Sequence, residues 1–589
     1  SALYGNNEYS LTDRTSNDID CPVVVDASDS STVFQPGCWL YAYPSVSYDE
    51  REAYRIDFEY YVGNHTLRAG FDRENNLSFY TDSYSGFSFV PNRLGGIYYY
   101  YQSWDVGAQL PNGAIVPDVN GDGSRVDTVR SRYEEWGGSF DTVSSAWYLE
   151  DTWTLSDAFE ISLGIRNEVY ENFNGVGEKF LNIEDQWAPR LALSWAPGRN
   201  DNQRVSLNWG RYHLPAMTLP NIFMGSSQLD EMRYFVYDGN RDSTTGAPLS
   251  IDQDGIPTTQ ELGSVLIRAD GSVPEARGAL DAGLEPMYQD EWIVAYERDF
   301  GDAWVASIRY VNRELQSLIE DVTVDFGLDS IGFPNVGPTQ GCYLVMTNPG
   351  TDMTTFCDAD GDGVLEETFI PADALGFPKA RRRYQSVELT VEKSAHDNWA
   401  LQGSYTLSWN KGNTEGSVKS DIGQSMANLT TDFDWPQLMD GAEGYLPNDR
   451  RHKLRLWTSY EVNDRLTLGA NLFAQSGRPK NTFGFGHPDG TPGWGPTFYL
   501  LQPDGTFEFT PRGSAGRTDW ITQVDLAALY SFSLGDSVEM ELRAEVFNVF
   551  DADGAEEVYE YAEQISTQLL LPTQYQAPRY FRFGLAMRF

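Results

Sequence analysis

The last ten residues of the chain alternate between apolar side chains and polar or small ones. Phe581, Phe583, Leu585, Met587 and Phe589 take one set of positions, and mostly Arg and Gly fill the positions between them. A period of two predicts a β-strand, because successive side chains of a strand point to opposite faces. One face is wholly apolar and ends on an aromatic residue, while the other carries arginine. The two faces of this strand therefore meet different surroundings.

The same alternation returns in earlier segments, notably 159–170 and 465–474. At 538–546 the apolar positions alternate with four charged ones, Glu539, Glu541, Arg543 and Glu545. A single strand with one charged face would also fit a half-buried strand of a soluble protein. Its repetition favours a hydrated lumen, as inside a membrane β-barrel whose outer face is apolar.

Short and long connections alternate along the chain. Short turns lie near 63–65, 156–157, 197–202, 300–302, 394–398, 462–464 and 534–537. Long segments rich in Gly, Pro, Asp, Asn and Thr lie at 83–138, 173–186, 215–286, 319–379, 412–447, 478–516 and 549–578. Short turns at one end and long loops at the other are typical of bacterial outer-membrane barrels, whose long loops are outside. A β-propeller would instead show a fixed repeat, which the chain lacks.

We therefore predict an all-β fold, an antiparallel transmembrane β-barrel with about fifteen strands in this chain and long extracellular loops. Its C-terminus is expected in the periplasm, and Tyr580, Phe583, Leu585, Met587 and Phe589 are the expected barrel-assembly signal. Counting back through the short turns, the first strand, near 39–62, runs from outside inward. An even-stranded barrel does not begin that way. We expect residues 1–589 to form one barrel that is incomplete at its N-terminus.

Composition agrees with a barrel and excludes other classes. No apolar run approaches the ~18 residues that a membrane helix needs. Aromatic residues make up 14% of the chain, which suits two interfacial girdles, although a secreted propeller has a similar composition. The formal net charge of -44 argues against a nucleic-acid partner, which requires the opposite sign.

The four cysteines fall into two local pairs, Cys21 with Cys38 and Cys342 with Cys357. Each pair would close a loop of about 15 residues, worth roughly 3 kcal/mol in the loop-entropy model. Even, local pairing in polar loops indicates disulfides and an oxidising compartment. A zinc site is not expected, because neither pair has CxxC spacing and histidines are few.

Two acidic segments have spacing typical of calcium loops. Asp358, Asp360 and Asp362 take positions 1, 3 and 5, Gly363 takes position 6, and Glu366 takes position 9. This pattern suits Ca²⁺, which prefers six to eight oxygen ligands, and Gly permits the sharp turn. A helix-flanked EF-hand is not expected, because its glutamate at position 12 is missing.

The second acidic segment consists of Asp118, Asn120 and Asp122, with Gly123 following. Calcium is the expected cofactor at both segments. An Asp-Gly-rich turn at a solvated loop tip remains the alternative for each. The weaker Asp252-Gln-Asp254-Gly255 is interpreted as a turn.

Catalytic patterns are weak, and no enzyme activity is expected. Gly403-Ser404 and Gly513-Ser514 lack the GxSxG elbow. The carboxylates of 537–547 resemble a glycosidase pair, but their regular alternation favours a lumen wall. The basic cluster Lys379–Arg383 begins a strand after a long loop; it is either a rim contact to lipopolysaccharide phosphates or a solvated strand end.

The C-terminal third of the chain contains a series of degenerate motifs in a fixed order and spacing. They are Tyr384–Val391, Trp399–Leu407, Gly412–Gly416, Ser420–Gln424, Leu446–His452, Ser476–Pro479 and Arg543–Asp551. In this order they resemble a known family, the TonB-dependent outer-membrane receptors, and within it the Oar-like subgroup. The resemblance is good over 380–589 and weaker over 50–320.

The resemblance implies a 22-stranded barrel filled by an N-terminal plug, which binds an extracellular ligand and imports it with energy relayed by TonB. The expected location is the bacterial outer membrane, with lipopolysaccharide, the TonB complex and an unknown ligand as partners. Plug, TonB box and first strands have no counterpart in the sequence, so contact with TonB is expected through a missing N-terminal part. An outer-membrane adhesin or envelope-scaffold barrel is the alternative function, and a secreted glycan-active enzyme is a third.

Overall fold

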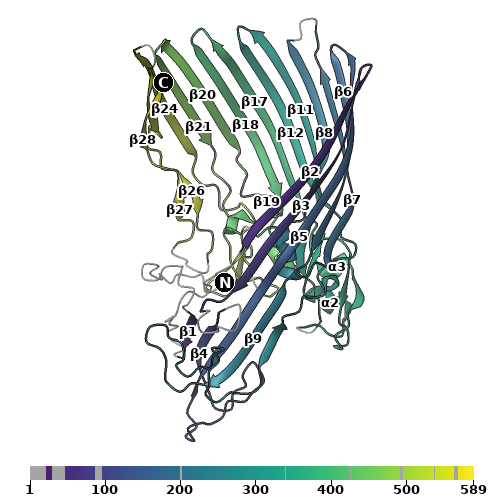
Figure 1. The fold of residues 1–589 in the computed structure, drawn as a ribbon, viewed down its shortest axis with the longest axis vertical. Helices are drawn as coiled ribbons and strands as arrows, with labels where there is room; N and C mark the ends of the chain where they lie inside the picture. The colour runs from purple at the N-terminus through teal and green to yellow at the C-terminus, as the bar shows by residue number, and fades with distance from the viewer. Residues whose placement is uncertain are drawn as a thin grey trace.

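The computed structural model describes residues 22–28, 47–86, 96–198, 202–337, 340–424, 426–490, 495–535, 538–562 and 568–589. Within them, fifteen strands form one antiparallel wall in which each strand pairs with the next along the chain (Figure 1). This confirms the predicted fold class and strand number. The wall strands are β2 (Ser47–Val62), β3 (His65–Ser83), β5 (Val126–Ser156), β6 (Phe159–Phe173), β7 (Lys179–Trp195), β8 (Gln203–Leu214), β11 (Met287–Gly301), β12 (Trp304–Ser317), β17 (Arg382–His396), β18 (Trp399–Gly412), β20 (His452–Asn463), β21 (Leu466–Gln475), β24 (Ile521–Leu534), β25 (Val538–Phe547) and β28 (Tyr580–Arg588).

The two outermost wall strands are β2 and β28. β2 pairs only with β3, and β28 pairs only with β25, among the described residues. The connections at one end of the wall, here named the turn end, are all short. The long connections lie at the other end, here named the loop end, which also holds the short turn between β6 and β7 (Figure 1). The predicted short turns are confirmed where they are described, for example Gly63-Asn64 between β2 and β3.

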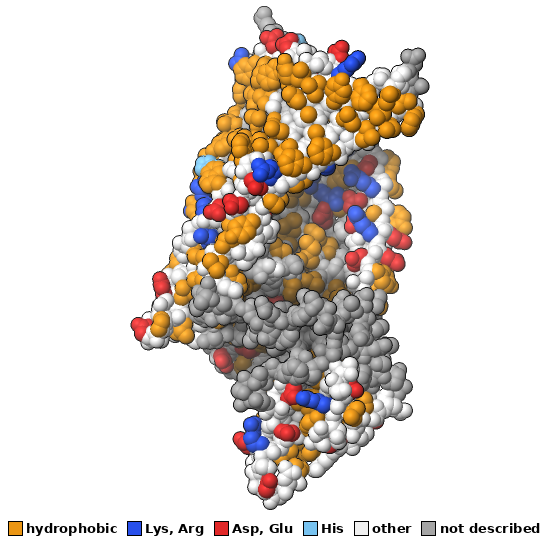
Figure 2. Space-filling model, turned by 90° about the vertical axis from the view of Figure 1, so that its left-hand side faces the viewer, with side chains coloured by type: hydrophobic (Ala, Val, Ile, Leu, Met, Phe, Trp, Pro, Cys, Tyr) orange, Lys and Arg blue, Asp and Glu red, His pale blue; other side chains and the backbone are white. Residues whose placement is uncertain are grey.

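The two faces of the wall differ as the alternation predicts. On β28 the exposed fraction of Phe583 is 78% and that of Leu585 is 56%, both on the outer face. Charged side chains on the inner face pair across strands, as Arg166 does with Asp72 at 2.7 Å. Apolar side chains gather in a broad band over the turn-end half of the wall, and charged ones line its hollow side (Figure 2). An apolar belt around a charged lumen is the pattern of a membrane β-barrel.

No helix in the described ranges is long and apolar enough to cross a membrane.

Wall strands extend into two of the predicted long loops. β6 and β7 stay paired as far as Phe173 and Lys179, so the connection predicted at 173–186 is only the turn 174–178. Asn174 closes this turn by accepting the backbone N–H of Glu178 at 2.8 Å. These strand ends lie toward the loop end, where Phe180, Leu181 and Ile183 are buried by packing against the loops, so the alternation that identifies a membrane strand fades.

β5 likewise begins at Val126, well before the predicted strand near 144–155. Its first half leaves the wall and forms a projecting sheet with β1 (Val23–Ala27), β4 (Tyr98–Trp104), β9 (Ser227–Val236) and β10 (Leu266–Asp270). Tyr99 and Tyr101 are fully buried there, and their hydroxyls donate to the carbonyls of Gly255 and Gly246 at 2.5 and 2.9 Å. The segments predicted as loops therefore fold as a compact element.

The largest apolar core lies at the loop end rather than in the wall. It includes Leu318, Ile319, Phe433 and Phe483, all almost fully buried. We call the elements around it the loop layer. They are α1 (Thr218–Gly225), η3 (Ala276–Gly278), β13 (Glu320–Thr323), α2 (Asp325–Ile331), β14 (Leu344–Thr347), β15 (Met353–Cys357), β16 (Glu366–Ile370), α3 (Ala372–Leu375), η4 (Ser420–Ile422), α4 (Pro436–Met439), β19 (Gly444–Tyr445), β22 (Tyr499–Leu501), β23 (Phe507–Phe509), β26 (Ala555–Val558) and β27 (Pro572–Tyr575).

Candidate functional site

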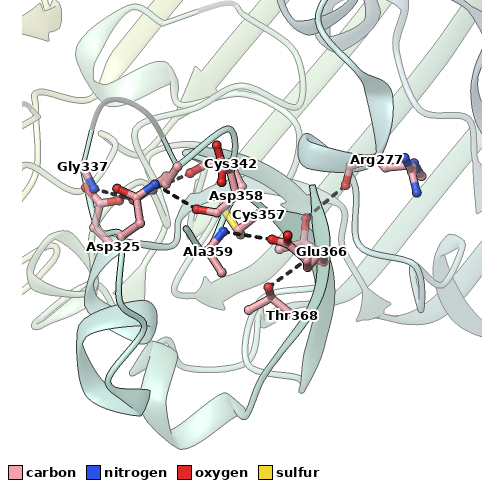
Figure 3. Close-up of a disulfide and its surroundings, with 12 residues drawn as sticks. Arg277, Asp325, Gly337, Cys342, Cys357, Asp358, Ala359, Glu366 and Thr368 are labelled. Carbon is pink, nitrogen blue, oxygen red and sulfur yellow. Dashed lines mark hydrogen bonds between the residues drawn. A yellow bond between two sulfur atoms is a disulfide. The ribbon is translucent and has the colours of Figure 1, made fainter. Parts of the chain in front are cut away.

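The loop layer holds a disulfide between Cys342 and Cys357, with Cα atoms 5.1 Å apart, which confirms the predicted pair (Figure 3). Both cysteines are buried in the loop-layer core. Cys357 ends β15 and is followed directly by Asp358, so the bridge fixes the chain where the acidic loop begins. The other predicted pair, Cys21 with Cys38, lies outside the described residues and stays a prediction.

Gln340 ties the disulfide region to α2 and is a residue that the sequence interpretation missed. Its side-chain amide donates to Asp325 Oδ1 at 2.7 Å, and its Oε1 accepts the backbone N–H of Gly337 at 2.7 Å. Its backbone carbonyl accepts the N–H of Asp358 at 2.7 Å. A lone glutamine in a polar loop gives no sequence signal, because its partners lie on separate elements.

The structure brings the first predicted metal set together. Carboxylate oxygens of Asp358, Asp360 and Asp362 all lie within 4.8 Å of one another. Glu366, at the start of β16, reaches back into the loop, where its Oε2 accepts the N–H of Ala359 at 2.9 Å (Figure 3). Three of the four predicted ligands thus converge on one short turn, and Glu366 is hydrogen-bonded to the backbone of that turn.

The carboxylate of Asp358 organises this turn. It accepts the backbone N–H groups of Gly361 and Gly363 at 2.6 and 2.9 Å, and that of Asp362 at 3.2 Å. Burial acts to raise the pKa of Asp358, but these hydrogen bonds outweigh it, and the pKa lies below its ordinary value. The group is therefore ionised at neutral pH, the form that a hard cation requires.

The second acidic segment adopts the same turn. Asp118 accepts the N–H groups of Gly121 and Gly123 at 2.7 and 3.1 Å, and Asp122 accepts that of Ser124 at 2.8 Å. Asn120 lies at the exposed tip of this turn, 3.5 Å from the Ser124 hydroxyl. The two segments therefore share one local backbone geometry, as their sequences predict.

A network of buried ion pairs lies beside the apolar core of the loop layer. The Arg512 side chain is fully buried, and its Nη1 donates to Asp421 Oδ2 at 2.9 Å. Lys419 Nζ donates to Asp432 Oδ1 at 2.6 Å, and both side chains are almost fully buried. The Arg512 guanidinium also lies 5.2 Å from the ring centroid of Phe498. Buried charges of this kind are tolerated only when they are paired and hydrogen-bonded.

The network joins three loops that are far apart in sequence. Asn481 donates to Asp421 Oδ2 at 3.2 Å and to Glu560 Oε2 at 3.1 Å, and Arg478 Nη1 donates to Glu560 at 2.7 Å. These residues come from the loops 412–447, 478–516 and 549–578, which we call the C-terminal loops. The network holds the C-terminal loops together as one unit.

Carboxylates outnumber cations in this interior. Glu320 of β13 accepts the N–H of Thr430 at 2.6 Å, but its second oxygen has no hydrogen-bond partner in the described part of the chain. Burial, and then the neighbouring Asp321 charge, raise the pKa of Glu320 well above its usual range. Burial raises the pKa of Asp321 to about 7. The loop layer therefore keeps carboxyl groups that are neutral in mild acid.

The expected barrel-assembly residues lie on the wall strand that ends the chain. Tyr580, Phe583, Leu585 and Met587 belong to β28, which pairs along its whole length with β25. The side chain of Phe589 follows the strand and is 95% exposed. The apolar side chains take alternate positions along β28, and every residue of this strand is exposed.

A wall of antiparallel strands with an apolar outer band, a charged lumen and a separate loop layer defines a membrane β-barrel. Residues 3–549 match the family model "TonB dependent receptor-like, beta-barrel". The chain belongs to this family.

The chain is also similar to individual proteins. The TonB-dependent transporter Oar of Myxococcus xanthus is 24% identical over 90% of this chain and 49% of its own length. The chain thus spans about half the length of this relative. Among solved structures, the outer-membrane transporter YddB from Escherichia coli superposes with a TM-score of 0.48 at 12% identity, covering 96% of this chain and 58% of YddB. The ferric citrate transporter FecA superposes with a TM-score of 0.43 at 14% identity, covering 92% of this chain and 55% of FecA.

Proposed function

We propose that this chain is the barrel portion of a TonB-dependent receptor in a bacterial outer membrane. Its loop layer binds an extracellular ligand, which the complete protein carries across the membrane. The family match over residues 3–549 is the observation that carries this proposal. The loop layer, ordered by its own core, disulfide and ion network, supports it, because pre-ordered loops lose less conformational entropy on binding.

The proposal includes an orientation and a partner. The loop end faces the outside and the turn end, with the C-terminus, faces the periplasm, as in other barrels with this asymmetry. Coupling to the TonB complex takes place through an N-terminal part, with a plug, that belongs to the complete protein. The charged lumen, with pairs such as Arg166–Asp72, is a hydrated surface against which a polar plug would pack.

Uptake is tested in cells that carry the complete gene. Candidate siderophores, oligosaccharides and peptides are supplied together, and their depletion from the medium is followed by mass spectrometry. We expect one class to be depleted by the wild type but not by strains lacking either this gene or TonB. Equal depletion by all three strains, together with lost surface attachment in the gene deletion, would instead establish the adhesin or scaffold role.

We also propose that Asp358, Asp360, Asp362 and Glu366 bind Ca²⁺, with the Asp118-Asn120-Asp122 turn as a second site. The converging carboxylates of Asp358, Asp360 and Asp362 and the ionised state of Asp358 support this. The turn's own backbone hydrogen bonds also suit a metal-free Asp-Gly turn.

Calorimetric titration of the oxidised protein with Ca²⁺ distinguishes a calcium site from a metal-free turn. Binding heat at micromolar to millimolar Ca²⁺ is expected, and Asp360→Asn with Asp362→Asn should remove the part due to the first site. Asp252→Asn is the matched control, because Asp252 caps an ordinary turn by accepting the N–H of Asp254 at 2.8 Å. Absence of any heat in protein with a verified Cys342–Cys357 bridge would refute calcium binding.

A further inference from the structure

Tryptophans mark two levels on the outer face of the wall. Trp304 and Trp399 lie at the turn end with ring centroids 5.6 Å apart, and Trp409 lies on the same face of β18, ten residues toward the loop end. Ten residues at about 3.3 Å each, on a strand tilted by about 40°, rise about 25 Å, which is the height of the apolar band in outer-membrane barrels. Outward side chains between these levels include Leu389, 45% exposed. The lipid headgroups of the loop-side leaflet therefore lie near Trp409.

Two basic side chains lie just beyond this level. Arg383 of β17 and Lys411 of β18 are direct cross-strand partners, so both point outward. Both are exposed, and neither forms an ion pair in the ranges that the structure describes. Arg383 Nε donates to Asn312 Oδ1 at 3.1 Å, and Lys411 Nζ lies 4.4 Å from the Tyr445 ring centroid. Like charges placed directly opposite each other destabilise a sheet unless an anion lies between them.

Two further cations converge on the same tyrosine. The guanidinium carbons of Arg451 and Arg517 lie 4.8 and 5.7 Å from the ring centroid of Tyr445, and that of Arg451 lies 5.1 Å from Trp409. Asp449 accepts a hydrogen bond from Arg517, and its carboxylate lies 3.8 Å from Arg451 Nη2. This buried carboxylate fixes both arginines beside the ring.

Arg383, Lys411, Arg451 and Arg517 form what we call the outer-face basic patch. In the described part of the chain, the carboxylates that adjoin the patch are Asp449 and Glu314, which lies opposite Arg383 on β12. The patch is therefore positive, although the whole chain carries a formal charge of -44. A positive patch at headgroup level on an acidic protein points to an anionic partner in the membrane.

We propose that the outer-face basic patch binds the phosphate groups of a phosphorylated glycolipid of the lipopolysaccharide type. Guanidinium groups offer paired donors that match phosphate oxygens, and lysine supplies a point charge. Trp409 and Tyr445 lie where amphipathic rings meet headgroups, and the acyl chains lie along the apolar band below. That the loop-side leaflet is the outer one rests on the proposed function, whereas recognition of a lipid phosphate does not.

The test uses the full chain, delipidated in detergent and titrated with bisphosphorylated lipid A under native mass spectrometry. We expect a defined complex with lipid A, at least fivefold weaker binding of its dephosphorylated form, and no displacement by millimolar inorganic phosphate. The variant Arg383→Gln with Lys411→Gln should bind lipid A at least fivefold more weakly than the wild type. Displacement by inorganic phosphate would instead mean a free-anion site and overturn the proposal.

Arg455→Gln with Arg465→Gln is the matched control, because it removes the same charge from the lumen face and the turn end. Its affinity for lipid A should equal that of the wild type. Unchanged binding by the patch variant, or an equal loss in the control, would overturn the proposal. Thermal unfolding in detergent verifies that both variants fold. The assay contains neither TonB nor cargo, so its failure is distinct from a failure of the transport proposal.

Discussion

Arg512 is the residue on which the buried ion network depends most. Arg512→Met would leave Asp421 buried without its arginine, a change that costs about 3–5 kcal/mol at comparable sites. We expect faster amide exchange throughout the C-terminal loops, measured by hydrogen–deuterium exchange mass spectrometry. The double variant Arg512→Met with Asp421→Asn should exchange more slowly than the single one, because it also removes the buried charge that has lost its nearest cation.

Arg455→Met is the control for this substitution, since Arg455 is an exposed lumen residue on β20. Its exchange in the C-terminal loops should match the wild type. Wild-type exchange in Arg512→Met would show that the network does not hold these loops together.

Asp321 should make the loop layer sensitive to pH. Burial raises its pKa to about 7 in the folded protein, against about 4 for an unfolded Asp, so the folded state holds an extra proton between these values. Stability contributed by the protonated group is full below about pH 4 and is lost as the pH rises toward and past 7. We expect amide exchange in 318–347, corrected for intrinsic rates, to show less protection at pH 8 than at pH 6.

Asp321→Asn should reduce this pH difference, because the amide does not titrate. Glu320, adjacent on β13 and also raised in pKa, accounts for what remains. Equal protection at both pH values in the wild type would contradict the prediction.

Contacts between residues of one local segment could be predicted from the sequence, whereas contacts between residues of different segments could not. Cys342, Cys357 and the Asp358 turn lie within one short stretch, so their spacing reveals the bridge and the clustered carboxylates. The ion network was invisible in the sequence, because Asp421 and Arg512 meet only after folding and lie in different loops. Single charged residues in polar loops carry no signal of burial.

At the scale of elements, alternation identified strands where membrane and lumen impose different faces. It placed the turns of the turn end as far as the structure describes them, but it missed the first half of β5, the start of β7 and the turn 174–178, which lie toward the loop end. Burial there follows from tertiary packing of both faces, so a strand has no period-two signature.

The terminal strand gives a prediction at this scale. Phe589 is 95% exposed, so Phe589→Ser should change the thermal stability of the refolded barrel little. If the terminal residues are an assembly signal, the amount of protein in the outer membrane should nevertheless fall severalfold, measured by immunoblot of membrane fractions. Phe550→Ser, a 75% exposed residue of the connection after β25, is the control and should leave the amount unchanged. A normal amount of the Phe589 variant in the outer membrane would contradict an assembly role for this residue.

At the scale of the whole molecule, every consequence of the proposed function depends on which end faces outward. Asn240→Cys places a thiol in the exposed connection after β9 at the loop end, and Asn64→Cys places one in the exposed turn between β2 and β3. Because the turn end is expected in the periplasm, a membrane-impermeant maleimide applied to intact cells should label Asn240→Cys and spare Asn64→Cys. After the outer membrane is permeabilised, both should react. The reverse pattern would place the loop layer and the outer-face basic patch on the periplasmic side, where neither capture of external ligands nor contact with outer-leaflet glycolipid is possible.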